Sequence, residues 1–148
     1  MSDSTAFLIG DISRLMRRRF DERARRIGVT RPQWRMLFTL SRNEGANQGT
    51  LAELIDVEPI TLCRMVDRLQ DAGLVERRRD PADRRAWQLY LTEQAHPILG
   101  QLRALADSLF EECMDDIADA DRARLNEMLT RIRQNLVAPE IEKAIAHG

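Results

Sequence analysis

The sequence predicts a mainly helical fold with one small β-hairpin, and three observations lead to this prediction. Apolar residues recur at steps of three and four along most of the 148 residues, which is the spacing of amphipathic helices. Apolar and polar residues alternate at residues 86–91, which indicates a strand. Between residues 50 and 91, a short helix, a tight turn, a longer helix and the hairpin follow one another. This order is typical of a winged helix-turn-helix.

Two amphipathic helices are expected before this unit. The apolar stripe of residues 7–27 ends at Gly28, which tolerates the left-handed backbone conformation that closes many helices. Thr30 and Gln33 have the spacing of a capping box and predict that the next helix begins at Thr30. The small and polar residues 43–49 are expected to form the loop that follows it.

The helix-turn-helix is expected to begin at Thr50, which has capping-box spacing with Glu53. Its second helix is expected to begin at Pro59, because proline is favoured in the first turn of a helix. Four apolar residues of this helix form a buried stripe, namely Leu62, Met65, Val66 and Leu69. Two helices joined by so short a turn are typical of a helix-turn-helix, whose second helix enters the major groove of DNA.

A β-hairpin is expected directly after this helix, with strands at residues 74–79 and 86–91. Asp80 and Pro81 occupy the first two positions of an expected type I turn. Five arginines stand between residues 77 and 85 against two aspartates, although the net charge of the chain is −1. A DNA-binding protein needs a local basic surface rather than a basic total, so the hairpin predicts binding to double-stranded DNA.

The C-terminal third of the chain is expected to form two more helices. Thr92 is expected to cap the first of them, and Cys113 is expected to lie in its buried apolar stripe. The second helix is expected to restart at Asp119 or Asp121 and to be interrupted by Pro139.

The helices at both ends of the chain carry more apolar surface than the small central unit can cover. We therefore predict that they form a dimer interface, since two-fold recognition of DNA half-sites would use one. The alternative is a monomer in which three helices pack within the chain. On the dimer interpretation the chain is one domain, 1–148, with a DNA-binding lobe at 30–91 and dimerisation helices at 5–28 and 92–146.

Composition and motifs argue against several other classes of protein. The cysteines Cys63 and Cys113 have no metal-binding spacing and the two histidines, His96 and His147, are isolated, so neither a metal nor another cofactor is expected. The sequence has no Gly-rich phosphate loop and no nucleophile motif, which argues against an enzyme. A signal peptide and a membrane span are also missing, so we expect a cytoplasmic protein that binds no membrane.

Three stretches give a more specific signal. They are the helix end VDRLQDAGLVER at residues 66–77, the motif DRR at residues 83–85 and the strand exit LTEQAHP at residues 91–97. Together they resemble the MarR family of transcriptional regulators, and most closely its SlyA-like branch. The order of the expected helices resembles that family over the whole chain.

The resemblance implies a homodimer that binds a pseudo-palindromic operator, usually as a repressor. It also implies that a small aromatic or phenolic acid binds between the DNA-binding lobe and the dimerisation helices and releases the DNA. Other family members sense peroxide through a cysteine in the first helix, where this sequence has none. Two alternatives stay open: a thiol-based redox regulator that uses Cys63, and a winged helix that binds only proteins.

The second helix of the helix-turn-helix is expected to contact DNA through Pro59, Ile60, Thr61, Arg64 and Arg68. Arg64 is the expected base contact, because a guanidinium group matches the two hydrogen-bond acceptors of guanine. The alternative for Arg68 is a surface ion pair with Asp67 or Asp71.

In the hairpin, the resemblance implies that Arg85 enters the minor groove, where a narrow groove concentrates negative potential. Asp83 is close enough in the sequence to orient Arg85. Asp67 is expected to pair with an arginine of the hairpin and to set the angle of this wing. The remaining arginines are expected to contact phosphates, namely Arg77, Arg78, Arg79 and Arg84.

An effector pocket is expected to have apolar walls and one or two cationic anchors. Trp34 and Phe38, at positions i and i+4 of a helix, are the candidates for a wall. Arg17 or Arg64 would receive the carboxylate of the ligand. The alternative is that Trp34 and Phe38 belong to the hydrophobic core.

Overall fold

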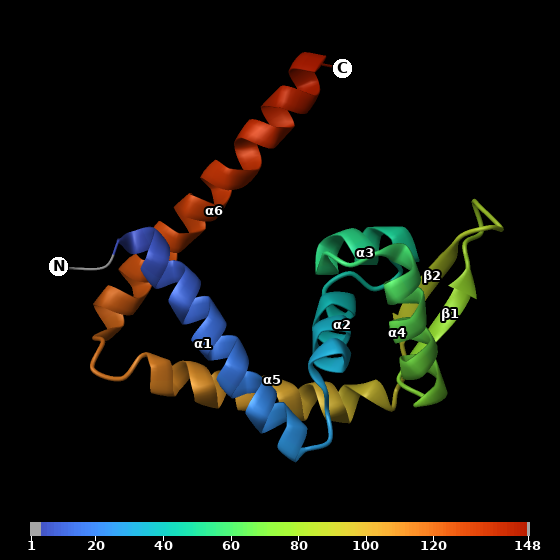
Figure 1. Cartoon of the computed structure of the whole chain (residues 1–148), viewed down its shortest axis with the longest axis horizontal. Coiled ribbons are helices and arrows are strands. Elements are labelled where there is room, and N and C mark those ends of the chain that lie inside the picture. Colours follow the sequence, from blue (N-terminus) through green and yellow to red (C-terminus); the bar gives the residue numbers. More distant parts are fainter. Residues whose placement is uncertain (1–3, 148) are drawn as a thin grey trace. The chain divides into compact units, whose positions relative to one another are not determined.

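The computed structural model describes the backbone of residues 4–147 and the side chains of residues 4–137. Within these residues, six helices and two strands follow one another along the chain (Figure 1). They are α1 (Thr5–Arg26), α2 (Arg31–Ser41), α3 (Gln48–Ile55), α4 (Pro59–Asp71), β1 (Val75–Arg79), β2 (Trp87–Leu91), α5 (Ala95–Cys113) and α6 (Asp119–His147). The predicted fold class is confirmed: the chain is mainly helical, with a two-stranded hairpin after a helix-turn-helix.

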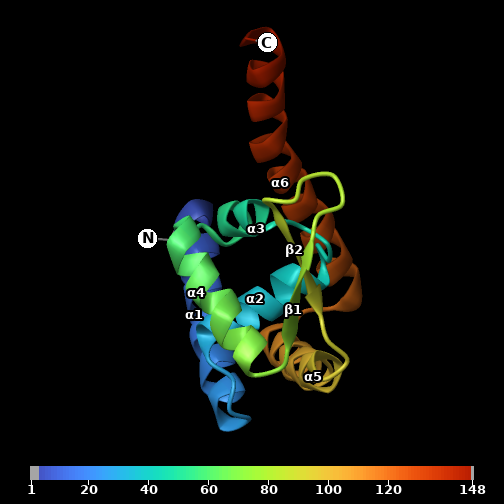
Figure 2. The same cartoon turned by 90° about the vertical axis from the view of Figure 1, so that its right-hand side faces the viewer.

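The chain divides into two compact units, Met1–Leu109 and Phe110–Gly148. In the first unit, α2, α3 and α4 pack against one another and against the hairpin. Figure 2 shows α4 and the hairpin side by side, with α2 behind them. Fully buried side chains from each of these elements and from α5 form the core, among them Leu37, Leu51, Leu62, Val66, Leu89 and Leu99. Burial of this apolar surface stabilises the hairpin, because two strands alone are only marginally stable in water.

The first helix of the helix-turn-helix begins earlier than the sequence predicted. The side chain of Asn47 caps α3 by accepting a hydrogen bond from the backbone N–H of Thr50 at 2.8 Å. The end of the preceding loop is paired with β2, because Gly45 donates to the carbonyl of Leu89 at 2.8 Å and Leu89 donates to the carbonyl of Ala46 at 3.0 Å. The helix therefore starts as soon as this pairing ends. The predicted cap at Thr50 is wrong, and so is the assignment of residues 48 and 49 to the loop.

The strands pair in the antiparallel register from Val75 opposite Leu91 to Arg79 opposite Trp87. The hydrogen-bonded turn of the connecting loop lies at Asp83–Ala86, where Ala86 donates to the carbonyl of Asp83 at 3.0 Å. The type I turn predicted from Asp80 is not formed by a backbone hydrogen bond. Instead, the carboxylate of Asp80 accepts the backbone N–H of Ala82 at 2.8 Å, and the loop is wider than a tight turn.

The hairpin is also tied to the end of α4. The hydroxyl of Thr92 donates to the carbonyl of Gly73 at 2.6 Å, and its backbone N–H donates to the carbonyl of Leu74 at 3.0 Å. α5 begins only at Ala95, three residues after Thr92, so Thr92 is not at the position that caps this helix. The predicted cap at Thr92 is therefore wrong. Gly73 has a φ of 77°, a conformation that glycine adopts without strain.

In the second unit, Arg122 organises the turn that joins α5 to α6. Its guanidinium donates to the carbonyls of Ile117 at 3.0 Å and Met114 at 2.9 Å, and it pairs with Glu111 at 3.0 Å. The buried side chain at this end of α5 is that of Met114, whereas Cys113 is exposed. The prediction that Cys113 is a core residue is wrong, because the turn buries the next position of the chain.

α6 extends from Asp119 to His147 and continues past Pro139, so the predicted interruption is wrong. A proline in the helix interior removes one backbone hydrogen bond, which leaves the other turns of this long helix in place.

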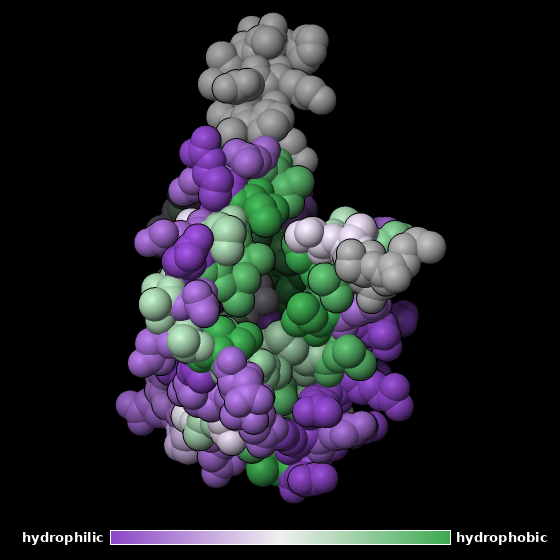
Figure 3. All heavy atoms as spheres, turned by 90° about the vertical axis from the view of Figure 1, so that its left-hand side faces the viewer, coloured by the Kyte–Doolittle hydropathy of each residue, from purple (hydrophilic) through white to green (hydrophobic). Residues whose placement is uncertain are grey.

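Exposed apolar side chains form stripes on the terminal helices. On α1 they include Phe7, Leu8, Ile12 and Leu15, and on α6 they include Met128, Leu129, Ile132 and Leu136. Figure 3 shows such hydrophobic side chains, coloured green, at the surface. Contiguous exposed apolar surface is typical of sites where proteins associate.

Replacing Asn47 by alanine is expected to destabilise the protein by about 1 kcal/mol, because α3 loses its side-chain cap. Replacing Thr50 by alanine is the matched control and is expected to change the stability by only a few tenths of a kcal/mol. Urea titration followed by circular dichroism measures both values. A larger loss for Thr50→Ala than for Asn47→Ala would contradict the observed start of α3.

Candidate nucleic-acid interface

The second helix of the helix-turn-helix, α4, has a buried face and an exposed face. Leu62, Val66 and Leu69 are buried against the core, and Met65 is half-buried. The residues predicted to contact DNA lie on the exposed face, namely Pro59, Ile60, Thr61, Arg64 and Arg68. Ile60 is 65% exposed, so its apolar side chain is accessible to a partner.

The sequence left open whether Arg68 forms a surface ion pair with an acid of the same helix. Within the described side chains, Arg68 forms no ion pair with Asp67 or Asp71, and Asp67 is paired with Arg77 of β1. Arg68 and Arg64 therefore present their charges to the solvent.

The loop of the hairpin carries exposed Arg84 and Arg85. The carboxylate of Asp83 accepts a hydrogen bond from the backbone N–H of Arg85 at 3.0 Å. Asp83 thus contacts the backbone of Arg85.

Two further arginines lie along the hairpin over aromatic rings. The guanidinium of Arg79 lies 5.0 Å from the ring centre of Trp87, and it donates to the carbonyl of Arg84 at 3.1 Å. The guanidinium of Arg78 lies 4.0 Å from the ring centre of Tyr90 and pairs with Glu76. Stacking on a ring leaves the outer edge of a guanidinium available for other partners.

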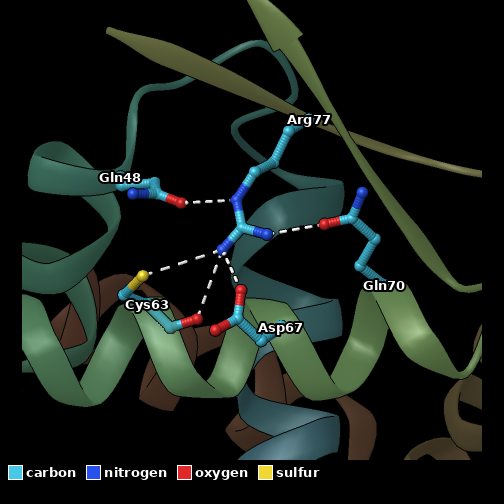
Figure 4. A network of polar contacts seen from close by, with 5 residues as sticks. All are labelled: Gln48, Cys63, Asp67, Gln70 and Arg77. Carbon is cyan, nitrogen blue, oxygen red and sulfur yellow. Dashed lines mark hydrogen bonds and ion pairs between the residues drawn. The ribbon is translucent and has the colours of Figure 1, made fainter. Parts of the chain in front are cut away.

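Arg77 differs from these arginines because its side chain points into the protein and is only 14% exposed (Figure 4). Its guanidinium donates to the side chains of Gln48 at 2.9 Å, Gln70 at 2.5 Å and Asp67 at 2.6 Å. It also donates to the carbonyl of Cys63 at 3.3 Å. These partners come from α3 and α4, so the contacts hold β1 against the helix-turn-helix.

The comparisons with known proteins agree with this geometry. The family model described as "MarR family" matches residues 29–87. The solved structure of transcriptional regulator PA3341 is 31% identical to this chain, with a TM-score of 0.77, and the match covers 90% of this chain and 98% of that one. The chain belongs to the MarR family.

Other solved MarR proteins have the same fold. A MarR-family regulator from Silicibacter pomeroyi is 26% identical, with a TM-score of 0.74 and 88% of each chain covered. A cysteine-to-serine mutant of MarR from E. coli, complexed with operator DNA, is 25% identical, with a TM-score of 0.71; the match covers 86% of this chain and 91% of that one. The family comprises DNA-binding transcriptional regulators and not enzymes.

In this MarR-family chain, Trp34 and Phe38 lie in a cluster of three aromatic rings with Phe20. The ring centres of Phe20 and Trp34 are 4.9 Å apart in an edge-to-face arrangement, and Phe38 lies 5.9 Å from Phe20 and 6.1 Å from Trp34. Both Trp34 and Phe38 are half-buried against the core. Arg17, predicted as a ligand anchor, is exposed on α1 and donates to the hydroxyl of Ser13 at 3.2 Å.

An open pocket of about 410 Å³ lies at α1 and the start of α2. It is lined by Arg18, Asp21, Glu22, Arg25, Thr30 and Arg31. None of the four residues predicted to hold a ligand lines it. Its charged walls also differ from the apolar pocket that the sequence predicted.

Asp21 is a buried acid of this region whose role sequence reasoning missed. It accepts hydrogen bonds from Arg31, with 2.6 Å to Nε, and from the indole N–H of Trp34 at 2.7 Å. Burial by itself raises the pKa of Asp21, but the hydrogen bonds from Arg31 and Trp34 and the charges of Arg31 and Arg25 outweigh it and lower the pKa below 3.8. The signal in the sequence that could have indicated burial of Asp21 is its position directly after Phe20, which is buried.

The thiols and acids give no sign of a metal centre within the described residues, where no cluster of His, Cys, Asp and Glu could hold an ion. Both cysteines are free, and the Sγ atom of Cys63 lies 3.8 Å from the guanidinium of Arg77. Among the described residues, no helix is long and apolar enough to cross a membrane.

The lowered pKa of Asp21 predicts a pH-dependent stability. Because the pKa is lower in the folded chain than in the unfolded one, ionised Asp21 stabilises the fold above pH 3.8, and this contribution is lost as the pH falls through the folded value. Asp21→Asn should therefore lower the free energy of unfolding at pH 7 by about 2 kcal/mol, the usual contribution of hydrogen bonds to a charged group.

Thermal unfolding of both proteins between pH 7 and pH 2.5, at a fixed protein concentration, measures this effect. The difference between wild type and Asp21→Asn should shrink below pH 3.8. Glu22→Gln removes the same charge from the exposed neighbouring residue and serves as the control. An equal loss of stability at all pH values would show that the charge of Asp21 is not responsible.

Proposed function

We propose that this chain is a homodimeric repressor that binds a pseudo-palindromic operator and is released by a small aromatic or phenolic acid. The observation that supports the DNA-binding surface best is the exposure of arginines on two elements that Arg77 holds together. Arg64 and Arg68 project from α4, and Arg84 and Arg85 project from the loop of the hairpin. An exposed helix face next to a basic hairpin fits the major groove and the adjacent minor groove of one DNA duplex.

In this proposal α4 lies in the major groove. Arg64 contacts a guanine through its two acceptors, while Ile60 and Thr61 meet thymine methyl groups or phosphates. Pro59 and Arg68 lie at the edges of the same contact. The exposure of Ile60, 65% of the maximum for this residue, supports its contact with a methyl group.

Arg85 is the proposed minor-groove residue, and Arg84, Arg78 and Arg79 contact phosphates. Asp83 orients Arg85 through the loop backbone, and Asp67 orients the wing through its ion pair with Arg77. With about eight phosphates neutralised per dimer, the logarithm of the affinity would fall against the logarithm of the salt concentration with a slope of about −7.

The dimer would form through the terminal helices, residues 5–28 and 92–146, while residues 30–91 form the DNA-binding lobe of a single domain, 1–148. The apolar stripes on α1 and α6 support this assignment, because a second copy of the chain would bury them in a self-complementary interface. The motifs of residues 66–77, 83–85 and 91–97 are the basis for placing the chain in the SlyA-like branch.

The effector proposal rests on the aromatic cluster. Trp34 and Phe38 are only half-buried, so each has an edge that a planar ligand could contact, and Arg17 or Arg64 would receive its carboxylate. A titration of isotope-labelled protein with salicylate tests this proposal. The chemical shift of the Trp34 indole N–H is measured by NMR and is expected to change. Shifts confined to residues far from Trp34 would contradict it.

The first prediction concerns Arg85. Arg85→Ala is expected to weaken binding to the DNA fragment upstream of the protein's own gene by about tenfold or more, since loss of one specific contact costs about 1–3 kcal/mol. Gel-shift titrations at several salt concentrations measure the affinity and its salt slope. Arg103→Ala, at an exposed arginine of α5, is the control and should bind like the wild type. Equal affinities for Arg85→Ala and wild type would refute the assignment of Arg85.

The second prediction concerns the dimer. Ile12 is 53% exposed on the apolar stripe of α1, and Ile12→Glu would place unpaired carboxylates in the proposed interface. The dimer dissociation constant is expected to rise by about 100-fold or more, because burying an unpaired charge is very unfavourable. Arg14→Glu adds a carboxylate on about the opposite face of α1 and is the control. Sedimentation equilibrium distinguishes the outcomes, and a dimer of unchanged affinity in Ile12→Glu would exclude this interface.

A further inference from the structure

The side chain of Arg77 occupies a position of β1 that normally holds an apolar residue. Side chains alternate between the two faces of a strand, so Val75, Arg77 and Arg79 share one face. Val75 is 2% exposed in the core, and Arg77, two residues closer to the loop, is only 14% exposed. A charge at such an inward position is tolerated only when the protein supplies its hydrogen-bond partners.

Those partners occupy each nitrogen of the guanidinium group (Figure 4). The Nε atom donates to Gln48 of α3, one Nη atom donates to Gln70, and the other donates to Asp67 and the carbonyl of Cys63. The planar fork of arginine can reach all of these acceptors at once, whereas the single ammonium of lysine cannot.

We infer that Arg77 is a positioning residue, which sets the place of the wing relative to the helix in the major groove and does not itself contact DNA. This inference rests on the proposed DNA-binding function, and it replaces the phosphate contact that the sequence suggested for Arg77. The guanidinium joins three elements, β1, α3 and α4, at a point before the hairpin leaves the core.

The position of Arg77 along the hairpin determines which part of the hairpin its contacts orient. Arg77 lies opposite Leu89, the last fully buried residue of the hairpin on the way to its loop. Beyond it, Arg78, Arg79 and the loop with Arg85 are exposed. A small change of strand angle at Arg77 would therefore displace the exposed loop by a larger distance, and the major-groove and minor-groove contacts would no longer fit one duplex together.

A positioning role and a phosphate contact predict opposite effects for two substitutions. Arg77→Lys keeps the positive charge, so a phosphate contact would largely survive. The set of hydrogen bonds that connects β1 to α3 and α4 would be lost. Asp67→Ala removes an acid from the DNA-facing surface, which favours DNA binding if Arg77 is then free to contact a phosphate. If Arg77 is a positioning residue, Asp67→Ala weakens DNA binding, because the guanidinium of Arg77 loses its charged partner.

Asp71→Ala is the matched control for Asp67→Ala. Both acids are exposed residues of α4, and both substitutions change the charge by the same amount, but only Asp67 contacts Arg77. Because the side chain of Asp67 is 56% exposed, Asp67→Ala is expected to fold like the wild type. Circular dichroism of each variant checks this.

The first measurement needs no DNA. Amide hydrogen exchange is followed in the hairpin, residues 75–79 and 87–91, of the wild type and the three variants. Exchange is expected to be about tenfold or more faster in Arg77→Lys and Asp67→Ala, and unchanged in Asp71→Ala, because local opening follows the loss of local contacts. Unchanged exchange in Arg77→Lys would overturn the positioning role.

The second measurement is the affinity for the DNA fragment upstream of the protein's own gene. Arg77→Lys and Asp67→Ala are expected to bind about tenfold or more weakly than the wild type, while Asp71→Ala binds equally or more tightly. Wild-type affinity in Arg77→Lys, or tighter binding by Asp67→Ala, would overturn the inference. If the wild type binds no DNA, the proposed function fails, and the exchange of the hairpin amides still decides whether Arg77 holds the wing.

Discussion

The contacts of the largely buried guanidinium of Arg77 are the interaction on which the DNA-binding unit depends. A two-stranded hairpin has too little buried surface to define its own orientation, and its outer half lies beyond the core. Arg77 supplies the missing constraint, because its nitrogen atoms are held by side chains of α3 and α4 and by the carbonyl of Cys63. The charge is stable in this place because each nitrogen atom of the guanidinium has a hydrogen-bond partner. The same contacts connect β1 of the hairpin to α3 and α4.

Other polar contacts also attach the hairpin to the rest of the unit, at the end of the hairpin far from its loop. Glu44 accepts the backbone N–H of Leu91 at 3.0 Å, and Gly45 and Ala46 pair with Leu89. Thr92 joins the hairpin to Gly73 at the end of α4. The loop before α3 thus pairs with the outer edge of β2, where it satisfies backbone groups of Leu89 and Leu91. The hairpin is attached along its base and exposed only near its loop.

The arginines of this chain serve two different purposes, and their partners distinguish them. Arg31 and Arg122 hold parts of the fold together through Asp21 and through the carbonyls of Ile117 and Met114. Arg64 and Arg85 are exposed, and their guanidinium groups are available to a partner. A count of arginines therefore overstates the surface that DNA can meet. The proposed interface is a small set of exposed arginines, carried by elements that the inward-pointing Arg77 connects.

The sequence by itself determined the fold class, the helix-turn-helix, the hairpin and the family, because these follow from periodic apolar residues and from motifs of neighbouring residues. It also placed Arg64, Arg85 and Asp67 on the exposed part of this unit. Only the tertiary structure decided that Asn47 caps α3, that Asp21 is buried beside Arg31, that Cys113 is exposed and that Arg77 points inward. Most of these depend on residues outside the local stretch: the loop before α3 pairs with Leu89, Arg31 reaches Asp21, and Gln48 and Asp67 receive the side chain of Arg77. Local spacing in the sequence carries no information about such partners. The sequence therefore does not distinguish an arginine that stabilises the fold from an exposed arginine that is proposed to bind DNA.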